Sequence, residues 1–421
     1  MPEKFIIAGD KKLSGIIKVN GSKNGASACL AACLLTEKEC VLNNLPLVKD
    51  ILNLLELIKE MGVAVEWVGE RSVKIKAKDI DPSKMNYEKF SKARTSVLLI
   101  GALLARFKNF KVSRPGGDRI GLRPITTHLQ AFEDLGVSIE EQGDFYCFKT
   151  KGLKVAEIVL SEFSVTATEN LLLAASLIEG ETIIKTAAAE PHIQDLVLML
   201  NEMGCDIVWQ GQHILKINGK KQLNRVEHNI IPDYIESGTF IIAGALMGDN
   251  LKIENAVLNN LDLFLAKMAE AGVDFKKQDD GAIILNKSEN LKAIKIQALP
   301  YPGFPTDLLP LAVPFLTQCH GKCLIHDPLY ENRLNYVQEL RKMGADIEIV
   351  DPHRAFVFGK TPLRGVSIES WDIRAGASLL LAGLLAQGQT TISNIEQIDR
   401  GYERIEERLA GLGAAIKRVV V

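Results

Sequence analysis

The chain has 421 residues, about three times the length of an average domain, and 47% are apolar, so we expect two or more domains with packed cores. Fifty basic and 52 acidic residues give a net charge of −2, which argues against a dedicated nucleic-acid-binding protein. The longest apolar stretches, such as 97–105, are far shorter than the roughly 18 residues of a membrane-spanning helix.

The beginning of the chain and its cysteines indicate the compartment. The first residues, Met-Pro-Glu-Lys-Phe, contain no apolar segment, and we expect no secretory signal there. Seven irregularly spaced cysteines predict free thiols in a reducing cytoplasm. Two cysteines and two histidines at 319–326 match no closed zinc pattern, so we expect a strand and a turn there and no metal site.

A repeat of about 70 residues organises the chain. Each copy contains an apolar helix rich in small residues, a β-like segment, an amphipathic helix that ends at a glycine, and further β-like sequence. The glycine recurs at intervals of 74, 68, 68, 72 and 69 residues, at Gly62, Gly136, Gly204, Gly272, Gly344 and Gly413. Glycine just past the end of a helix adopts a left-handed conformation without steric cost, so the chain can turn into a strand.

The first helix of each copy is apolar on nearly every side and is therefore predicted to be buried. The six copies occupy 30–35, 100–105, 173–178, 242–247, 311–316 and 381–386. The fifth contains Pro314 and is the poorest helix of the set. The second helix of each copy has apolar residues at helical spacing, such as Val337, Leu340 and Met343.

Six copies predict an α/β fold with two domains of three βαβαββ-like copies each. The first domain is expected at 20–229, and the second at 1–19 together with 230–421. Segment 228–236, which contains Pro232 and Asp233, is the expected crossover between them. Because no linker is of low complexity, we expect the domains to lie close together with a ligand-binding cleft between them.

Segment 114–124 has a composition typical of a loop. Its eleven residues include three glycines, two prolines and three arginines, which exclude a helix or a regular strand and predict a mobile or strained loop. Arg119 and Arg123, with exposed backbone amides, would suit an anionic ligand, and a solvated surface loop is the alternative. No Lys-Ser or Lys-Thr follows the last glycine, so the segment is not a Walker A motif.

Lys23 stands at the start of the first buried helix, where Ser22 or Asn24 could act as the N-cap. A cation is unfavourable at the positive end of a helix unless an anion binds there, so Lys23 is either a ligand-binding residue or simply exposed. Asp307 precedes the fifth buried helix and is a candidate base, helix cap or ion-pair partner. Arginines suited to phosphate or carboxylate lie at turns near the apolar helices, at Arg94, Arg333, Arg374 and Arg400.

Taken together, these segments resemble the enolpyruvyl transferases, most closely the members that act on UDP-N-acetylglucosamine. The resemblance runs nearly end to end and is carried by 21–24, 94–97, 115–124, 232–236, 304–307, 331–333, 372–374 and 398–404. It implies a two-domain inverse α/β barrel with three repeats in each half. It also implies transfer of the enolpyruvyl group of phosphoenolpyruvate to the 3-hydroxyl of UDP-N-acetylglucosamine, with release of phosphate through a tetrahedral intermediate.

That reaction is the first committed step of peptidoglycan synthesis. The resemblance implies small-molecule substrates, no metal or organic cofactor, no nucleic-acid or membrane partner, no obligate protein partner and a cytoplasmic location. Asp307 would orient the sugar hydroxyl and take its proton, and Asp118 would protonate the methylene carbon or help product release. Lys23 and Arg400 would complete the catalytic group.

The binding residues also follow from the resemblance. Phosphoenolpyruvate would contact Lys23, Asn24, Arg123, Arg333, Arg374 and Arg400. The UDP-sugar would contact Arg94, Arg123, Pro124, Ile125, Thr126, Thr127, Ser164, Val165, Asp307 and Leu329.

Four positions depart from the family pattern. Most members have Cys where this chain has Asp118, and without that thiolate the epoxide fosfomycin has no soft nucleophile to alkylate, so we expect resistance. Thr126, Glu162 and Tyr234 replace, respectively, an acidic residue near the uracil, a Lys and an Arg. These changes leave two alternatives open: transfer to another nucleotide or sugar, and a non-catalytic paralogue that only binds ligands.

Overall fold

The computed structural model describes residues 2–118 and 120–420, which form two compact units. Of the described residues, unit 1 contains 2–20, 118, 120–122 and 232–420, and unit 2 contains 21–117 and 123–231. Arg119, expected to suit an anionic ligand, lies outside the described residues. Each unit contains three copies of the predicted repeat, and the helix of each copy that was expected to be apolar is buried.

In unit 2 the first copy contains α1 (Lys23–Ala32), β3 (Cys40–Asn43), α2 (Lys49–Glu60), β4 (Ala64–Gly69) and β5 (Ser72–Lys76). The second contains α4 (Leu98–Arg106), β6 (Asn109–Ser113), α5 (Thr126–Asp134), β7 (Val137–Gln142) and β8 (Phe145–Thr150). The third contains α6 (Val165–Ala175), β10 (Gly180–Lys185), α7 (Pro191–Glu202), β11 (Asp206–Trp209) and β12 (Ile214–Gly219). The connections include α3 (Tyr87–Lys92), β9 (Glu157–Val159) and β13 (Glu227–Asn229).

In unit 1 the fourth copy contains α8 (Tyr234–Met247), β14 (Gly248–Glu254), α9 (Asp262–Glu270), β15 (Phe275–Lys277) and β16 (Ile283–Leu285). The fifth contains α10 (Leu309–Leu316), β18 (Gly321–His326), α11 (Val337–Lys342), β19 (Asp346–Asp351) and β20 (Arg354–Gly359). The sixth contains α12 (Ile373–Leu385), β22 (Gln389–Ser393), α13 (Glu396–Asp399), α14 (Ile405–Gly411) and β23 (Ala415–Val420). Four further strands are β1 (Glu3–Ala8), β2 (Leu13–Lys18), β17 (Lys295–Gln297) and β21 (Ser367–Glu369).

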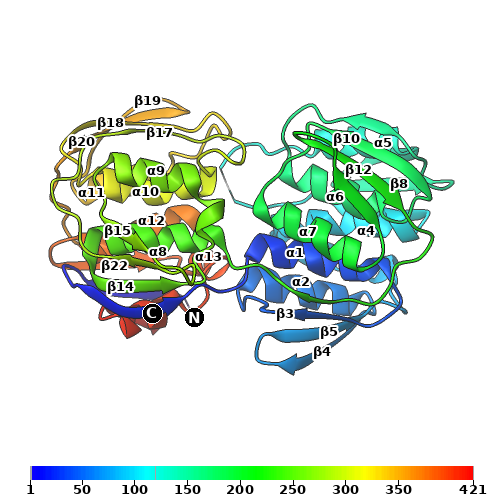
Figure 1. Cartoon of the computed structure of the whole chain (residues 1–421), viewed down its shortest axis with the longest axis horizontal. Coiled ribbons are helices and arrows are strands. Elements are labelled where there is room, and N and C mark those ends of the chain that lie inside the picture. The colour runs from blue at the N-terminus through cyan, green and yellow to red at the C-terminus, as the bar shows by residue number, and fades with distance from the viewer. Residues whose placement is uncertain (1, 119, 421) are drawn as a thin grey trace. The chain divides into compact units, whose positions relative to one another are not determined.

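Each copy forms its own small sheet around the same pattern of strands. In the order β11-β12-β10-β9, the central strand β10 pairs antiparallel with the hairpin strand β12 and parallel with β9. The sheets β4-β5-β3-β13, β15-β16-β14-β2 and β19-β20-β18-β17 repeat this order, whereas β6-β8-β7 has three strands. In the sixth copy β1 stands between β22 and β23. Figure 1 shows helices inside each unit and sheets at its periphery.

Small residues let the buried helices approach one another closely. A Cβ atom added at Gly101 of α4 would lie 2.3 Å from the backbone oxygen of Asn170 in α6, so only glycine fits there. Helix α8 has all 14 of its residues buried. Helix α10, expected to be the poorest of the six because of Pro314, has eight residues with the proline inside it. No helix of the described residues is long and apolar enough to span a membrane.

The six glycines predicted to end the amphipathic helices all have positive φ. Their φ angles are +94°, +87°, +106°, +90°, +95° and +102° in chain order. Each stands two residues after the last residue of α2, α5, α7, α9, α11 or α14, just past the C-cap residue. The prediction of a left-handed glycine at the end of each amphipathic helix is therefore confirmed.

Gly413 and Gly411 provide a matched pair for testing this cap. A Cβ at Gly413, where φ is +102°, would lie 3.2 Å from the Lys12 carbonyl oxygen, so Gly413→Ala should lower the free energy of unfolding by about 1–2 kcal/mol. Gly411 is helical with nothing within 4 Å of its Cβ position, so Gly411→Ala should raise it by up to about 1 kcal/mol. Urea unfolding measures both changes, and equal losses would contradict the cap.

Candidate functional site

Asp307 lies between two buried arginines in unit 1. It belongs to the 3-10 turn η5 (Thr306–Leu308), which leads into α10, while Arg333 precedes α11 and Arg374 lies in the first turn of α12. Arg333 Nη2 donates to Asp307 Oδ1 at 2.5 Å, and Arg374 Nε donates to Asp307 Oδ2 at 3.0 Å. The two arginines are 1% and 3% exposed, whereas the Asp307 side chain keeps 31% exposure. Asp307 is therefore an ion-pair partner that remains accessible, and the N-cap of α10 is Leu308.

Further aspartates keep the two arginines charged. Burial lowers the pKa of Arg333, but the charges of Asp307, Asp372 and Asp327 outweigh burial and raise it above its usual value. Burial likewise lowers the pKa of Arg374, and Tyr402, Asp307 and Asp233 together raise it. The site therefore holds two desolvated guanidinium groups that stay cationic. A charged guanidinium group can bind a phosphate or a carboxylate through two parallel hydrogen bonds.

These supporting residues were missed as site residues in the sequence. Asp372 and Asp233 are the N-caps of α12 and α8, where an Asp immediately before an apolar helix is itself a sequence signal. Asp327 accepts hydrogen bonds from Thr306 Oγ1 at 2.6 Å and from the Leu329 backbone N–H at 2.9 Å. Leu329 is a local partner of Asp327, but Thr306 and Arg333 belong to other segments, so the local sequence does not mark Asp327 as a site residue. Leu329, expected near the sugar, is 43% exposed.

Asp118 pairs with Arg400 within unit 1. Arg400 Nη1 donates to Asp118 Oδ1 at 2.7 Å and to Gln397 Oε1 at 2.9 Å. Nearby, the Leu122 N–H donates to Glu331 Oε1 at 2.9 Å, which helps to explain why 118–122 groups with unit 1. This differs from the expectation that all of 114–124 belongs to the first domain. The described residues of 114–124 contain neither helix nor strand, as predicted.

Lys23 is buried at the start of α1 in unit 2. Ser22 is the N-cap, because its Oγ accepts from the Gly25 N–H at 3.2 Å, so the first of the two predicted caps is confirmed. Lys23 Nζ lies 3.6 Å from Asp50 Oδ2 in the first turn of α2. The alternative of an exposed lysine is therefore wrong, and Asp50 offsets the unfavourable position of the cation at the helix start. Asn24 is partly exposed.

Arg94 binds the backbone of the segment that leads into α5. Its Nη1 donates to the Arg123 carbonyl at 2.7 Å and its Nη2 to the Pro124 carbonyl at 3.3 Å. Arg123 has a φ of +46°, a left-handed conformation that costs an arginine roughly 1–2 kcal/mol and persists only where its surroundings hold it. Ile125 follows as the N-cap residue of α5. The strained backbone predicted for this segment is therefore present at Arg123.

The remaining predicted sugar-binding residues lie at the starts of α5 and α6. Thr126 and Thr127 open α5, Ser164 caps α6 through the Ala167 N–H, and Val165 is the first residue of α6. Thr127 Oγ1 donates to Glu162 Oε1 at 3.1 Å. A carboxylate thus stands beside Thr127 where the resemblance placed a lysine. Tyr234, the last of the four departures, is a buried residue at the start of α8.

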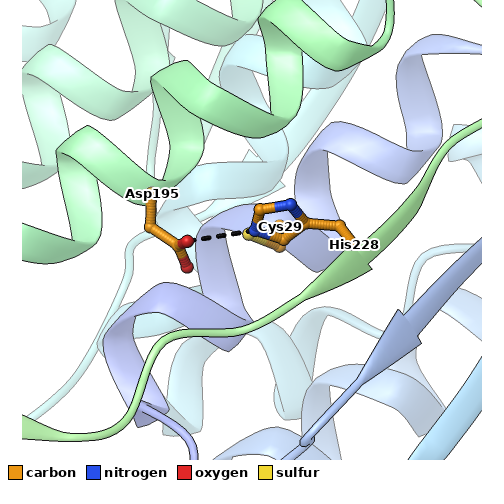
Figure 2. Close-up of side chains that lie close together, drawn as sticks. All are labelled: Cys29, Asp195 and His228. Atoms are coloured by element: carbon orange, nitrogen blue, oxygen red, sulfur yellow. Dashed lines mark hydrogen bonds and ion pairs between the residues drawn. The ribbon is translucent and has the colours of Figure 1, made fainter.

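A buried cluster that the sequence did not reveal lies elsewhere in unit 2. Cys29 of α1, Asp195 of α7 and His228 of β13 have ligand-type atoms within 4.8 Å of one another, and Figure 2 shows Asp195 directed towards the other two. Within 2–118 and 120–420 this is the only such grouping. All seven cysteines are described and free. No sequence spacing indicates the cluster, because its members are far apart in the chain.

A family profile described as EPSP synthase (3-phosphoshikimate 1-carboxyvinyltransferase) matches residues 7–409. The UDP-N-acetylglucosamine 1-carboxyvinyltransferase of Koribacter versatilis (strain Ellin345) is 42% identical over 99% of this chain and 96% of its own. UDP-N-acetylglucosamine 1-carboxyvinyltransferase 2 of Bacillus subtilis (strain 168) is 40% identical over the same shares.

Solved structures show the same fold at lower sequence identity. The enolpyruvyl transferase NikO from Streptomyces tendae matches with a TM-score of 0.90 and 23% identity, covering 100% of this chain and 99% of that one. An EPSP synthase from Acinetobacter baumannii matches with a TM-score of 0.76 and 20% identity, covering 100% of both chains.

The buried His128 is expected to make the folded protein less stable as the pH falls. Burial and then the nearby charge of Arg94 lower its pKa to about 3, while its Nε2 lies 2.8 Å from Thr166 Oγ1. The folded-state pKa is below the unfolded value near 6.5, so protons favour the unfolded chain and stability is lost as pH falls below about 6.5. From pH 7 to pH 5, wild type should lose about 2 kcal/mol more than His128→Gln in urea unfolding. Equal losses would contradict a neutral, buried His128.

Proposed function

The chain belongs to the EPSP synthase family and is an enolpyruvyl transferase, and we propose that it transfers the enolpyruvyl group of phosphoenolpyruvate to the 3-hydroxyl of UDP-N-acetylglucosamine. Membership confirms the resemblance and the α/β fold inferred from the sequence. The acceptor is proposed because relatives about 40% identical along the whole chain carry the name of that reaction. The reaction would release phosphate and supply precursors for peptidoglycan.

One observation carries the chemistry: the Asp307 carboxylate is held by two buried guanidinium groups and is still open to solvent on one side. In the addition step, the sugar 3-hydroxyl oxygen would bond to carbon 2 of phosphoenolpyruvate and give its proton to Asp307. Asp118 would deliver a proton to carbon 3, or would assist product release. Elimination would then break the bond between carbon 2 and the phosphate oxygen, the proton of carbon 3 would return to Asp118, and the proton on Asp307 would leave with phosphate.

The proposed binding residues match the charge of phosphoenolpyruvate. It carries a phosphate and a carboxylate on three carbons, so it needs several donors with fixed positive charge. Arg333 and Arg374 are buried cations in unit 1, and Arg400 is the cation paired with Asp118 there. We propose that Lys23 and Asn24 at the start of α1, and Arg123 with its constrained backbone, bind the same substrate.

The acceptor is the part of the proposal with a competing candidate. Arg94, Arg123 to Thr127, Ser164, Val165 and Leu329 are proposed for the UDP-sugar. Glu162, hydrogen-bonded to Thr127, favours instead an acceptor that presents a hydroxyl or N–H at this position. A screen of nucleotides and sugars as acceptors in the phosphate-release assay distinguishes the two candidates.

We further propose that the reaction needs no metal or organic cofactor and takes place in the cytoplasm, without a nucleic-acid, membrane or obligate protein partner. The proposed chemistry needs only proton transfers and anion binding, which the described side chains supply. Seven free cysteines suit a reducing compartment.

Asp307→Ala tests the base. Wild type should release phosphate from phosphoenolpyruvate only when UDP-N-acetylglucosamine is present, and Asp307→Ala should lower kcat by at least about 100-fold, because it removes the proton acceptor. A colorimetric phosphate assay measures both rates, with Asp346→Ala on β19 as a control outside the site. Release that is independent of the UDP-sugar, or unchanged in Asp307→Ala, would contradict the proposal.

Asp118→Cys tests the loop residue. The wild-type enzyme should keep its activity after incubation with fosfomycin, because a carboxylate is a poor nucleophile towards the epoxide. Asp118→Cys should lose activity with time and gain the mass of one inhibitor molecule in intact-protein mass spectrometry. A covalent adduct on wild-type Asp118 would overturn this expectation.

A further inference from the structure

His228 is held between two carboxylates of helix α7. Its Nε2 lies 3.0 Å from Asp195 Oδ1, and its Nδ1 lies 2.9 Å from Glu202 Oε2. Burial lowers the pKa of His228, but the hydrogen bonds and charges of Asp195 and Glu202 outweigh burial and raise it above its usual value. Each ring nitrogen then donates a hydrogen bond to a carboxylate, so the imidazolium ring binds α7 at both Asp195 and Glu202. In that state neither nitrogen has a lone pair for a metal ion, which is why we do not assign this cluster as a metal site.

The second oxygen of Asp195 points to the start of α1. Asp195 Oδ2 accepts the Ile231 N–H at 3.3 Å, and the Ile231 carbonyl accepts the Ser22 N–H at 2.7 Å. Ser22 is the N-cap of α1, and Lys23 is its first residue. A continuous series of hydrogen bonds within unit 2 thus leads from His228 through Asp195 to the residue next to Lys23.

Packing at Gly25 supports the same connection. A Cβ atom at Gly25 would lie 3.2 Å from Asp195 Oδ2 and 3.6 Å from Ile230 Cγ2, so the first turn of α1 lies directly against this carboxylate. Asp195 is therefore in contact with the helix start from two directions, through Ile231 and through Gly25. Cys29 lies one turn further along α1 and closes the cluster (Figure 2).

We propose that Asp195, held by His228, which Glu202 holds from its other ring nitrogen, is a positioning residue that fixes the N-terminus of α1 and so sets where Lys23 meets phosphoenolpyruvate. The inference rests on the proposed function of Lys23. It differs from a merely structural role, because a loosened helix start would move the lysine without altering the other substrate's contacts. Misplacing a group that grips substrate by about 1 Å can cost on the order of 100-fold in rate.

A double-mutant cycle between Asp195→Asn and Lys23→Ala tests the proposal. Asp195→Asn should raise KM for phosphoenolpyruvate and lower kcat/KM for it by about 10- to 100-fold, with KM for UDP-N-acetylglucosamine unchanged within about 2-fold. Combined with Lys23→Ala, it should add less than about 2-fold, because the lysine that it positions is already gone. The matched control is Asn201→Ala on the same helix, which removes hydrogen bonds of 2.8 and 2.9 Å to Ile207 instead.

The outcomes separate this inference from the function on which it rests. If the wild-type enzyme is active but the effects of Asp195→Asn and Lys23→Ala on kcat/KM multiply, the positioning role is wrong and the function stands. The same conclusion follows if Asn201→Ala changes KM for phosphoenolpyruvate as Asp195→Asn does. If wild type shows no turnover, the proposed function fails, and the cycle is repeated on the thermal shift induced by phosphoenolpyruvate. If Asp195→Asn reduces the phosphoenolpyruvate-induced thermal shift of the wild-type protein but not that of the Lys23→Ala protein, positioning is supported. If it reduces the shift equally in both proteins, positioning is overturned.

Discussion

Burial of two guanidinium groups is the constraint around which unit 1 is organised. Removing a cation from water costs several kcal/mol even after relaxation, so Arg333 and Arg374 can be 1% and 3% exposed only if carboxylates surround them. The carboxylates come from the ends of different elements: Asp233 caps α8, Asp372 caps α12, and Asp307 precedes α10. The three apolar helices must therefore begin near one another, and the repeat brings the starts of these helices to one place.

Unit 2 uses the same repeat with a different charge pattern. The starts of α1 and α6 are capped by Ser22 and Ser164 rather than by aspartates, and each hydroxyl leaves the helix end without a negative charge. The positive end of α1 is balanced instead by Asp50, which lies beside Lys23 on a neighbouring helix. Neutral caps suit helix ends that are to receive an anionic ligand, because an aspartate cap would already occupy the positive end of the helix dipole.

The sequence predicted those features that depend on neighbours within one copy of the repeat. The six glycines, the burial of the small-residue helices and the Ser22 cap follow from local sterics and hydrogen bonding, and each was confirmed. The Asp195–His228 pair joins residues 33 positions apart and was not predicted. The meeting of Asp307 and Arg374 across 67 positions was expected only through the family resemblance, not from local spacing. The spacing of these residues in the sequence does not indicate that they contact each other, because the contacts result from how the copies of the repeat pack.

In the proposed reaction, substrate binding at Asp307 would exchange one anion for another on the two arginines. Folding has already removed Arg333 and Arg374 from water and oriented their donors on a carboxylate, so a bound phosphate or carboxylate meets cations whose desolvation and ordering are complete. In the proposed reaction, a substrate anion would take over part of that hydrogen bonding, so donors of Arg333 and Arg374 would shift from the Asp307 carboxylate to the substrate. The carboxylate that satisfies two buried cations in the free protein would then become available to accept the proton of the sugar hydroxyl.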